Sequence, residues 1–475
     1  MRSARLPAGW VGPHWVEAGL AAEERTATAV GTLDGGVAAR VDRRGLVVPA
    51  TGGWSLDWWI GAEDGWHTPS REPATRVRQL LVGHAPVVET VLRVPGGEVV
   101  HRCYGARDAS GDAVVVEIEN RSHVPVALVF AVRPYDLGAL ATLRRVSLRD
   151  DVVTIDRRAS VSFDRVPQFA TAGGATTDIA AEVFAGTQRS PADVGDVRDR
   201  RGLASLAAVF PLPHTATRRV AIARAPVDPG SLPDADAAVR GWDAHRERGM
   251  RVVVPDERLQ AAVDACVAAT LLQADDRAFD DPVAVGALER WGFGDEVARL
   301  ADRRGFRVPE GAVFITDEVE VGDVAAAVDQ LDALVGAASP TWTWPPERGG
   351  AAHRSAEVLG LARSMLVGES DDGTLAIWPL VTDAWLGQGV EVHGAPTASG
   401  PFSYAVRWHG ARPAVLWEAP PGVTVTAPGL DPSWSSTDAT GEALLAPVEP
   451  AGGLPKVYGG VDVAGRLDEP GASFP

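Results

Sequence analysis

Residues 341 to 367, TWTWPPERGGAAHRSAEVLGLARSMLV, mark the point where the chain passes from a turn-rich loop into a helix. Trp342 and Trp344 flank a threonine, two prolines follow, and Glu347 precedes two glycines. Two interpretations fit this loop. In the first, the indole faces stack on pyranose rings beside a carboxylate that transfers a proton, and the loop is a sugar site. In the second, the tryptophans fill the junction between helices and have only a packing role.

Upstream of this loop the sequence has helical character from about residue 255. Leu259, Val263 and Leu271 fall on one stripe, as expected of a buried helix face. Asp281 is a candidate N-cap with a proline after it, and Gly292 is a natural stop. The predicted helices are 256–273, 281–292, 294–305, 321–336 and 352–367, joined in part as helical hairpins.

On both sides of this helical region the sequence pattern predicts β-strands. Runs such as AVVVEIEN (113–120) and VPVALVFAVRP (124–134) are separated by short polar turns, and 150–164 alternates with period two. Many short strands between glycine-rich turns favour an antiparallel sandwich. Strands return in 372–380, 389–400, 401–410 and 412–420, and we expect loose strands and a frayed tail after about 425.

This order predicts a multidomain α+β protein. We expect an N-terminal β-sandwich over 1–225, a linker with one helix (roughly 233–248) over 226–254, a helical domain over 255–368, and a C-terminal β domain with a loose tail over 369–475.

Composition limits the classes of ligand and location. The chain has 475 residues and a formal net charge of −18, which disfavours nucleic acid and anionic membranes and leaves neutral ligands open. It lacks an apolar run of about 20 residues and a secretory signal. Cys103 and Cys266 are expected to be reduced, packed thiols. We therefore expect a cytoplasmic protein; its oligomeric state stays open.

Sequence motifs predict neither a metal site nor a cofactor site. There is no paired His/Cys spacing and no HExxH motif, no phosphate-binding P-loop and no dinucleotide fingerprint. A serine-hydrolase elbow is also lacking.

Three stretches resemble the six-hairpin glycosidases, the glucoamylase-like and maltose-phosphorylase-like enzymes. They are SLDWWIGAEDGWHTPS with PVVETVLRVPGGEVVHRCYGA, then ALERWGFGDEVARL, and then 341–367 as it continues into GTLAIWPLVTDAWLGQGVEVHGAPTASGPFSYAV. The resemblance implies an N-terminal β-supersandwich, a linker helix, an (α/α)6 toroid and a C-terminal β domain. Twelve helices need on the order of 200 residues, so five helices in 255–368 predict a shortened toroid.

The sequence also departs from that family at the loop. The resemblance leads us to expect an acidic residue directly after the second tryptophan and its proline, but Pro346 stands there and Glu347 follows. It also implies a Gly-Asp pair before His353, where this chain has GGAAH.

Inverting glycoside hydrolysis needs two carboxyl groups about 6.5–9.5 Å apart. The candidate catalytic residues are Glu347 as base with Asp317, Glu318 or Glu320 as acid. Other candidate carboxyls in the same kind of loop are Asp275, Asp276 and Asp280. The alternative for each carboxyl is a helix cap or a solvated loop charge.

Candidate substrate-binding residues lie on two parts of the chain. Trp342, Trp344 and His353 belong to the loop and the following helix, and Asp64 and Trp66 belong to the sandwich, near Asp57, Glu63 and His67. Two functions stay open: a non-catalytic, glycosidase-like protein that binds carbohydrate, and an inverting glycoside hydrolase that acts on an α-glucoside or a related oligosaccharide. We expect both tryptophans of the loop to be partly exposed beside Glu347.

Overall fold

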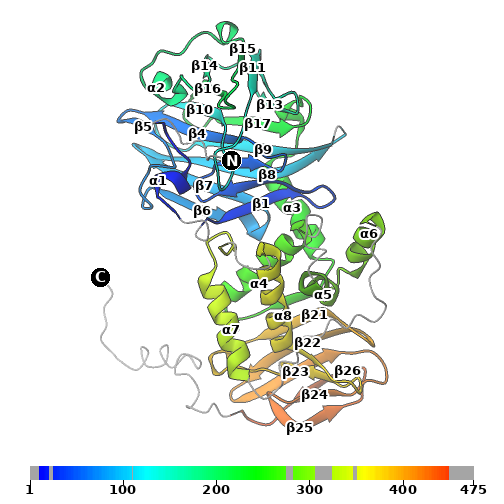
Figure 1. Ribbon diagram of the computed structural model, residues 1–475. Coiled ribbons are helices and arrows are strands. Elements are labelled where there is room, and N and C mark those ends of the chain that lie inside the picture. Colours follow the sequence, from blue (N-terminus) through cyan, green and yellow to red (C-terminus); the bar gives the residue numbers. More distant parts are fainter. Residues whose placement is uncertain are drawn as a thin grey trace, which may run out of the picture. The chain divides into compact units, whose positions relative to one another are not determined.

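The computed structural model describes residues 10–20, 25–109, 111–273, 282–304, 324–345 and 350–448 (Figure 1). The described residues form two compact units. The first unit takes those within Met1–Asp243, Ala268–Phe279 and Ala338–Ala352, and the second those within Ala244–Val267, Asp280–Ala337 and His353–Pro475. The loop with Trp342 therefore belongs to the N-terminal unit, although about a hundred residues separate it from that unit's main part.

The first unit contains two large sheets in which all strand pairs are antiparallel. One sheet has the order β1 (Ala27–Thr32), β2 (Gly36–Asp42), β3 (Val47–Pro49), β4 (Ser55–Ala62), β10 (Val126–Arg133), β16 (Ser205–Leu212) and β14 (Phe169–Gly173), with β5 (Gly65–His67) paired to β4. The other has the order β15 (Asp196–Arg198), β11 (Arg145–Arg149), β12 (Val152–Ile155), β13 (Ala159–Phe163), β17 (Thr217–Ala223), β9 (Gly111–Asn120), β8 (Gly97–Asp108), β7 (Val87–Val94) and β6 (Val77–Leu81).

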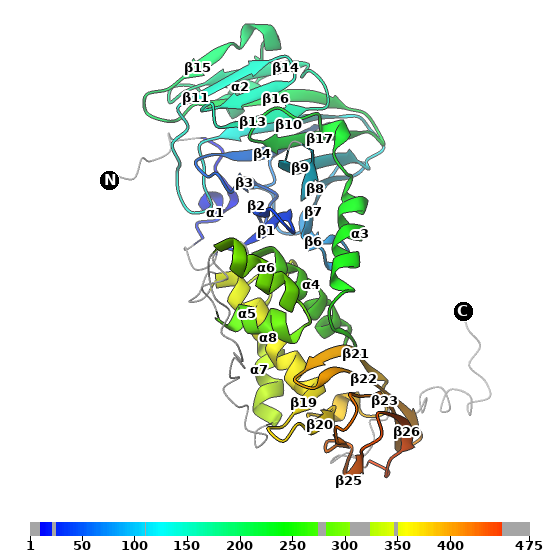
Figure 2. The same cartoon turned by 90° about the vertical axis from the view of Figure 1, so that its right-hand side faces the viewer.

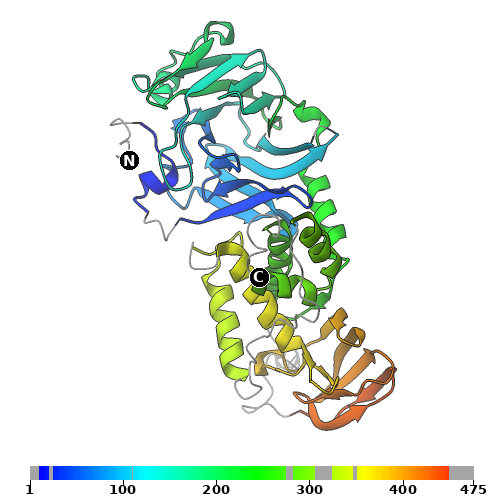
Figure 3. The same ribbon diagram turned by 45° about the vertical axis from the view of Figure 1, so that its right-hand side comes forward.

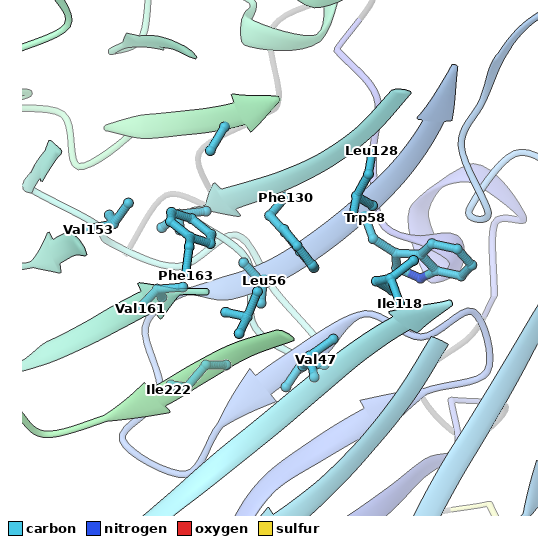
Figure 4. Packing of buried hydrophobic residues seen from close by; sticks show 14 of the residues in the cluster. Val47, Leu56, Trp58, Ile118, Leu128, Phe130, Val153, Val161, Phe163 and Ile222 are labelled. Carbon is cyan, nitrogen blue, oxygen red and sulfur yellow. The ribbon is translucent and has the colours of Figure 1, made fainter. Parts of the chain in front are cut away.

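The two sheets pack face to face because alternate residues of each strand are apolar. Leu56 and Trp58 of β4 and Phe130 of β10 enter one core with Ile118 and Phe163 of the other sheet (Figure 4). Trp59, the next residue after Trp58, points to the opposite face of its sheet. There it packs in a second cluster with Ile179 and Val183 of α2 (Ile179–Phe184).

A single helix follows the sandwich, as expected for 233–248. It is α3 (Ala235–Arg246), and Figure 2 shows it beside β6 to β9. The carbonyl of Pro233 just before α3 accepts hydrogen bonds from Tyr104 Oη at 3.0 Å and from Arg219 Nη2 at 2.7 Å. A short strand, β18 (Arg251–Val253), follows the helix and pairs with the C-terminal strand β21 (Val390–Thr397).

Five helices lie in the described part of 255–368, close to the five predicted. They are α4 (Glu257–Gln273), α5 (Pro282–Arg290), α6 (Gly294–Arg304), α7 (Val324–Ala337) and α8 (Gly350–Leu366). Gly292 ends the α5 turn with φ +88°, a conformation that favours glycine. The following helix, α6, packs against α5 as a hairpin. The shortened toroid itself stays a prediction.

Two small sheets form the C-terminal part, and their strands from β21 onward are drawn in orange to red in Figure 3. One has the order β18, β21 (Val390–Thr397), β22 (Gly400–His409), β23 (Arg412–Glu418) and β26 (Thr440–Leu444). The other has the order β19 (Val367–Glu369), β20 (Leu375–Ile377), β24 (Val425–Ala427) and β25 (Asp431–Ser436). The strands after 425 are thus regularly paired rather than loose, and the expected tail after 448 lies outside the described residues.

The α+β class with antiparallel sheets is confirmed, and so are two free, buried cysteines, Cys103 in β8 and Cys266 in α4. Burial raises the pKa of both thiols, that of Cys266 to about 12. In the described part of the chain, no helix is both long and apolar enough to cross a membrane.

Candidate functional site

The loop 339–345 is organised around the hydroxyl group of Ser339. Ser339 Oγ lies 3.1 Å from Thr341 Oγ1 and 2.8 Å from Thr343 Oγ1, and it accepts the backbone N–H of both threonines at 3.2 Å. Thr28 of β1 donates to Thr341 Oγ1 at 2.7 Å. Because Thr341 and Thr343 are buried, these bonds fix the loop on the sandwich.

Trp342 adopts an unusual backbone conformation in this loop. Its φ is +52°, in the left-handed region, where a bulky side chain other than glycine is a genuine outlier. The backbone N–H of Trp342 donates to Ser339 O at 3.0 Å, and the side chain is half-buried. A strained conformation of this kind persists only where the surroundings hold it, and such residues gather at ligand sites.

Trp344 contradicts one expectation. Its side chain is only 7% exposed, so it is buried rather than partly open. The loop does not alternate strictly: Thr341, Thr343 and Trp344 are all buried, and Trp342 alone among these four residues stays half-buried. Trp344 therefore fits the packing interpretation, and its place in substrate binding has no support from its exposure.

The candidate catalytic carboxyls lie outside the described residues. These are Glu347, Asp317 and Glu318, and also Glu320, Asp275, Asp276 and Asp280. The expected spacing of a carboxyl pair therefore stays a prediction, as does the role of each of these groups.

His353 lies in the first turns of α8 and belongs to the second unit. Its Nε2 is 3.5 Å from Glu357 Oε1, one turn further along the helix, and Arg354 donates to the same carboxylate at 2.7 Å. This pattern is typical of ion pairs on a helix surface. A role of His353 toward a sugar stays a prediction.

Trp66 and Asp64 lie at the hairpin between β4 and β5. Trp66 is half-buried, and its ring stacks on Phe184 with centroids 5.4 Å apart. One indole face is therefore covered by protein. Asp64 is exposed and accepts a hydrogen bond from His67 Nε2 at 2.7 Å, and this bond lowers the pKa of Asp64.

His67 ties the hairpin to the following turn. Its second ring nitrogen, Nδ1, lies 2.9 Å from Glu72 Oε1, so both nitrogens face carboxylates. The cluster thus holds local structure, and substrate binding by Asp64 and Trp66 stays a prediction.

Asp57 takes part in a buried ion pair on the face of the sheet that carries Trp59. Arg133 Nη1 donates to Asp57 Oδ2 at 3.1 Å, and Trp59 Nε1 donates to the same oxygen at 3.1 Å. Arg133 also lies over the rings of Trp59 and Tyr135 and donates to the carbonyl of Val11. These bonds anchor the segment around Val11, so Asp57 has a structural role.

Sequence reasoning missed Ser339, Thr341 and Thr343 as organisers of the loop, and Arg133 as the partner of Asp57. The alternation of hydroxyl and indole side chains in SPTWTW was the available signal for the first set.

No group of three or more histidine, cysteine, aspartate or glutamate side chains suited to a metal ion occurs among the residues that the structure describes.

No family model matches the sequence, and no curated protein matches it. Among solved structures the chain is similar to a bacterial glucoamylase complexed with acarbose, at 8% identity and a TM-score of 0.41, over 63% of this chain and 51% of that one. It is also similar to a protein described as a candidate kojibiose phosphorylase from the human microbiome, at 6% identity and a TM-score of 0.42. That match covers 85% of this chain and 89% of the other chain.

A third similar structure is an inverting mannosidase from Bacteroides thetaiotaomicron, at 10% identity and a TM-score of 0.32, over 52% of this chain and 35% of that one. The chain thus spans about half of the glucoamylase it matches and about a third of the mannosidase.

Proposed function

We propose that this chain binds a neutral oligosaccharide and that Trp342 is the side chain on which a sugar ring stacks. The observation that carries the proposal is the left-handed backbone of a half-buried tryptophan, whose N–H donates to the Ser339 carbonyl and whose two neighbouring threonines are held by the Ser339 hydroxyl group. An aromatic ring in a fixed position loses little conformational freedom when a ligand stacks on it. The hydroxyl network thus prepares the loop for binding.

The class of ligand follows from charge and from the resemblance seen in the sequence. A net charge of −18 repels anionic ligands and leaves a neutral sugar favoured. Six-hairpin glycosidases act on glycosides, so an α-glucoside such as maltotriose is the first ligand to test. We place the chain with the non-catalytic relatives of these enzymes.

The binding test compares two tryptophans with different surroundings. Maltotriose is titrated into the wild type, into Trp342→Ala and into the control Trp434→Ala, another half-buried indole, which packs edge-on against Trp417. We expect Trp342→Ala to weaken binding about tenfold or more, the equivalent of one good aromatic contact. The control should bind as the wild type does. Equal affinity of Trp342→Ala and wild type for maltotriose would refute the proposal.

The alternative function is tested in the same samples. Release of glucose with inversion at the anomeric carbon, lost in Glu347→Gln while binding is kept, would make the chain the inverting hydrolase and overturn the non-catalytic assignment. We expect binding without turnover.

A further inference from the structure

Two surface turns lie together on the sandwich. Residues 121–125 join β9 to β10, and residues 213–216 join β16 to β17. Each turn carries the chain from one sheet to the other, and the four strands form two neighbouring pairs, β9 with β17 and β10 with β16. The fold therefore holds the two turns side by side.

A single buried side chain joins these turns. Asn120 Nδ2 donates to Val124 O at 2.9 Å in the first turn and to Leu212 O at 3.1 Å at the start of the second. Its Oδ1 accepts the backbone N–H of Ser122 at 2.9 Å. The backbone of Asn120 also accepts the N–H of Thr215 at 3.0 Å, so both turns are fixed to one residue.

Each turn presents one exposed imidazole, His123 and His214. The two ring centroids are 6.2 Å apart and the ring planes are tilted by 46°. His214 Nδ1 lies 2.5 Å from the carbonyl oxygen of Ser122, which can only accept, so Nδ1 carries the proton. In the neutral ring the lone pair is therefore on Nε2. A backbone carbonyl that fixes the tautomer in this way is typical of histidines that bind metals.

We propose that His123 and His214 form a two-histidine site for a borderline divalent transition metal such as Zn²⁺, Ni²⁺ or Cu²⁺. Neutral imidazole suits these ions, with metal–nitrogen bonds of about 2.0–2.1 Å. Two exposed rings at this separation reach one ion after a side-chain rotation, and water fills the other coordination positions. The charged neighbour Arg121 is held by Glu119 at 2.8 Å, so its charge is compensated beside the site.

The two histidines contribute little to the turns themselves. His214 contributes one hydrogen bond to the turn, whereas the side chain of His123 is exposed and its backbone N–H donates to Gly96 O. Replacement of His123 by alanine should therefore leave the turn intact. This gives a variant that separates loss of a ligand from loss of structure.

The experiment is calorimetric titration of the full, untagged chain with NiCl₂ and with ZnCl₂ at pH 7.5. We expect one ion per chain, at least tenfold weaker binding in His123→Ala and in His214→Ala, and unchanged binding in His409→Ala, the control for an exposed histidine elsewhere. Binding should also weaken as pH falls to 5, because protonated imidazole cannot ligate.

Three results would overturn the proposal: single variants that bind as the wild type does, equal loss in His409→Ala, or no saturable binding at millimolar metal. None of them bears on sugar binding by Trp342, because the two proposals share no residue.

Discussion

The loop 339–345 and the β4–β5 hairpin both present a half-buried tryptophan of the first unit, yet they are built differently. Trp342 sits on a strained backbone that neutral hydroxyl groups hold in place. Trp66 lies on Phe184 in a regular hairpin whose neighbours are charged, with Asp64, His67 and Glu72 in one cluster. Backbone strain at a half-buried indole points to binding, and ring stacking points to structure.

The strongest expected effect tests the buried ion pair between Asp57 and Arg133, on the strand that leads into the hairpin. Arg133→Met leaves Asp57 buried without its partner, and we expect unfolding by urea to show a loss of about 3–5 kcal/mol. Arg78→Met is the matched control, because its pair with Glu98 is exposed and should contribute about 1 kcal/mol or less. The double change Asp57→Leu with Arg133→Met should recover part of the loss. If Arg133→Met lowers the free energy of unfolding by less than 1 kcal/mol, the pair with Asp57 does not stabilise this side of the sheet.

The second effect compares the two tryptophans directly. Trp66→Ala removes a ring stacked on Phe184 and should cost about 2 kcal/mol, less than a fully buried tryptophan would. Trp342→Ala should cost about 1 kcal/mol or less, and it should affect sugar binding instead. If Trp342→Ala proves the more destabilising change in urea unfolding, Trp342 is a packing residue and the contrast between the regions fails.

The third effect tests the hydroxyl network. Ser339→Ala leaves two buried threonines short of a partner, and we expect a loss of about 1–2 kcal/mol together with weaker maltotriose binding. Ser433→Ala removes an exposed hydroxyl bonded to Asp431 and should change neither quantity. Unchanged binding in Ser339→Ala would mean that the network does not position Trp342.

The fourth effect tests the strain at Trp342 itself. A left-handed backbone costs residues other than glycine roughly 1–2 kcal/mol. Trp342→Gly should therefore be about 1 kcal/mol more stable than Trp342→Ala, the reverse of the usual order, while both lose binding. Thermal unfolding of the two variants measures the difference, and a more stable alanine variant would show that the conformation is not strained.

The smallest effect concerns pH. The hydrogen bond from His67 lowers the pKa of Asp64 below its usual 3.8, so its stabilising effect is present above pH 3.8 and is lost as pH falls through the lowered value. The stability difference between wild type and Asp64→Asn should therefore shrink between pH 5 and pH 2. The loop 339–345 is held by uncharged hydroxyls, and the difference between wild type and Ser339→Ala should stay constant over the same range.

Helices and strands were predictable where the local pattern was strong. The apolar stripe of 256–273 predicts α4, and Gly292 as a helix end predicts α5, each with bounds within two residues of those in the structure. The segment 150–164 alternates like one strand, but it forms two paired strands, β12 and β13. The turn between them could not be predicted, because Asp156 and Arg157 adopt positive φ and no glycine marks the position. Turn chemistry that breaks the usual residue preferences cannot be read from composition.

The candidate site was less predictable because its bonds join distant parts of the chain. The sequence places Asp57 among tryptophans, but its partner Arg133 is 76 residues away, where no local pattern marks it as a partner. The exposure of Trp342 and the burial of Trp344 depend on the register of a loop against β1, which local periodicity does not contain.

The bond between Thr28 and Thr341 spans 313 residues, and this has a consequence for biosynthesis. A ribosome adds about 5–20 residues per second, so the partner of Thr28 is made on the order of half a minute after Thr28 itself. The nascent sandwich must wait for that interval with the edge at β1 incomplete. Slow codons placed between the two positions would lengthen the wait without altering a single amino acid.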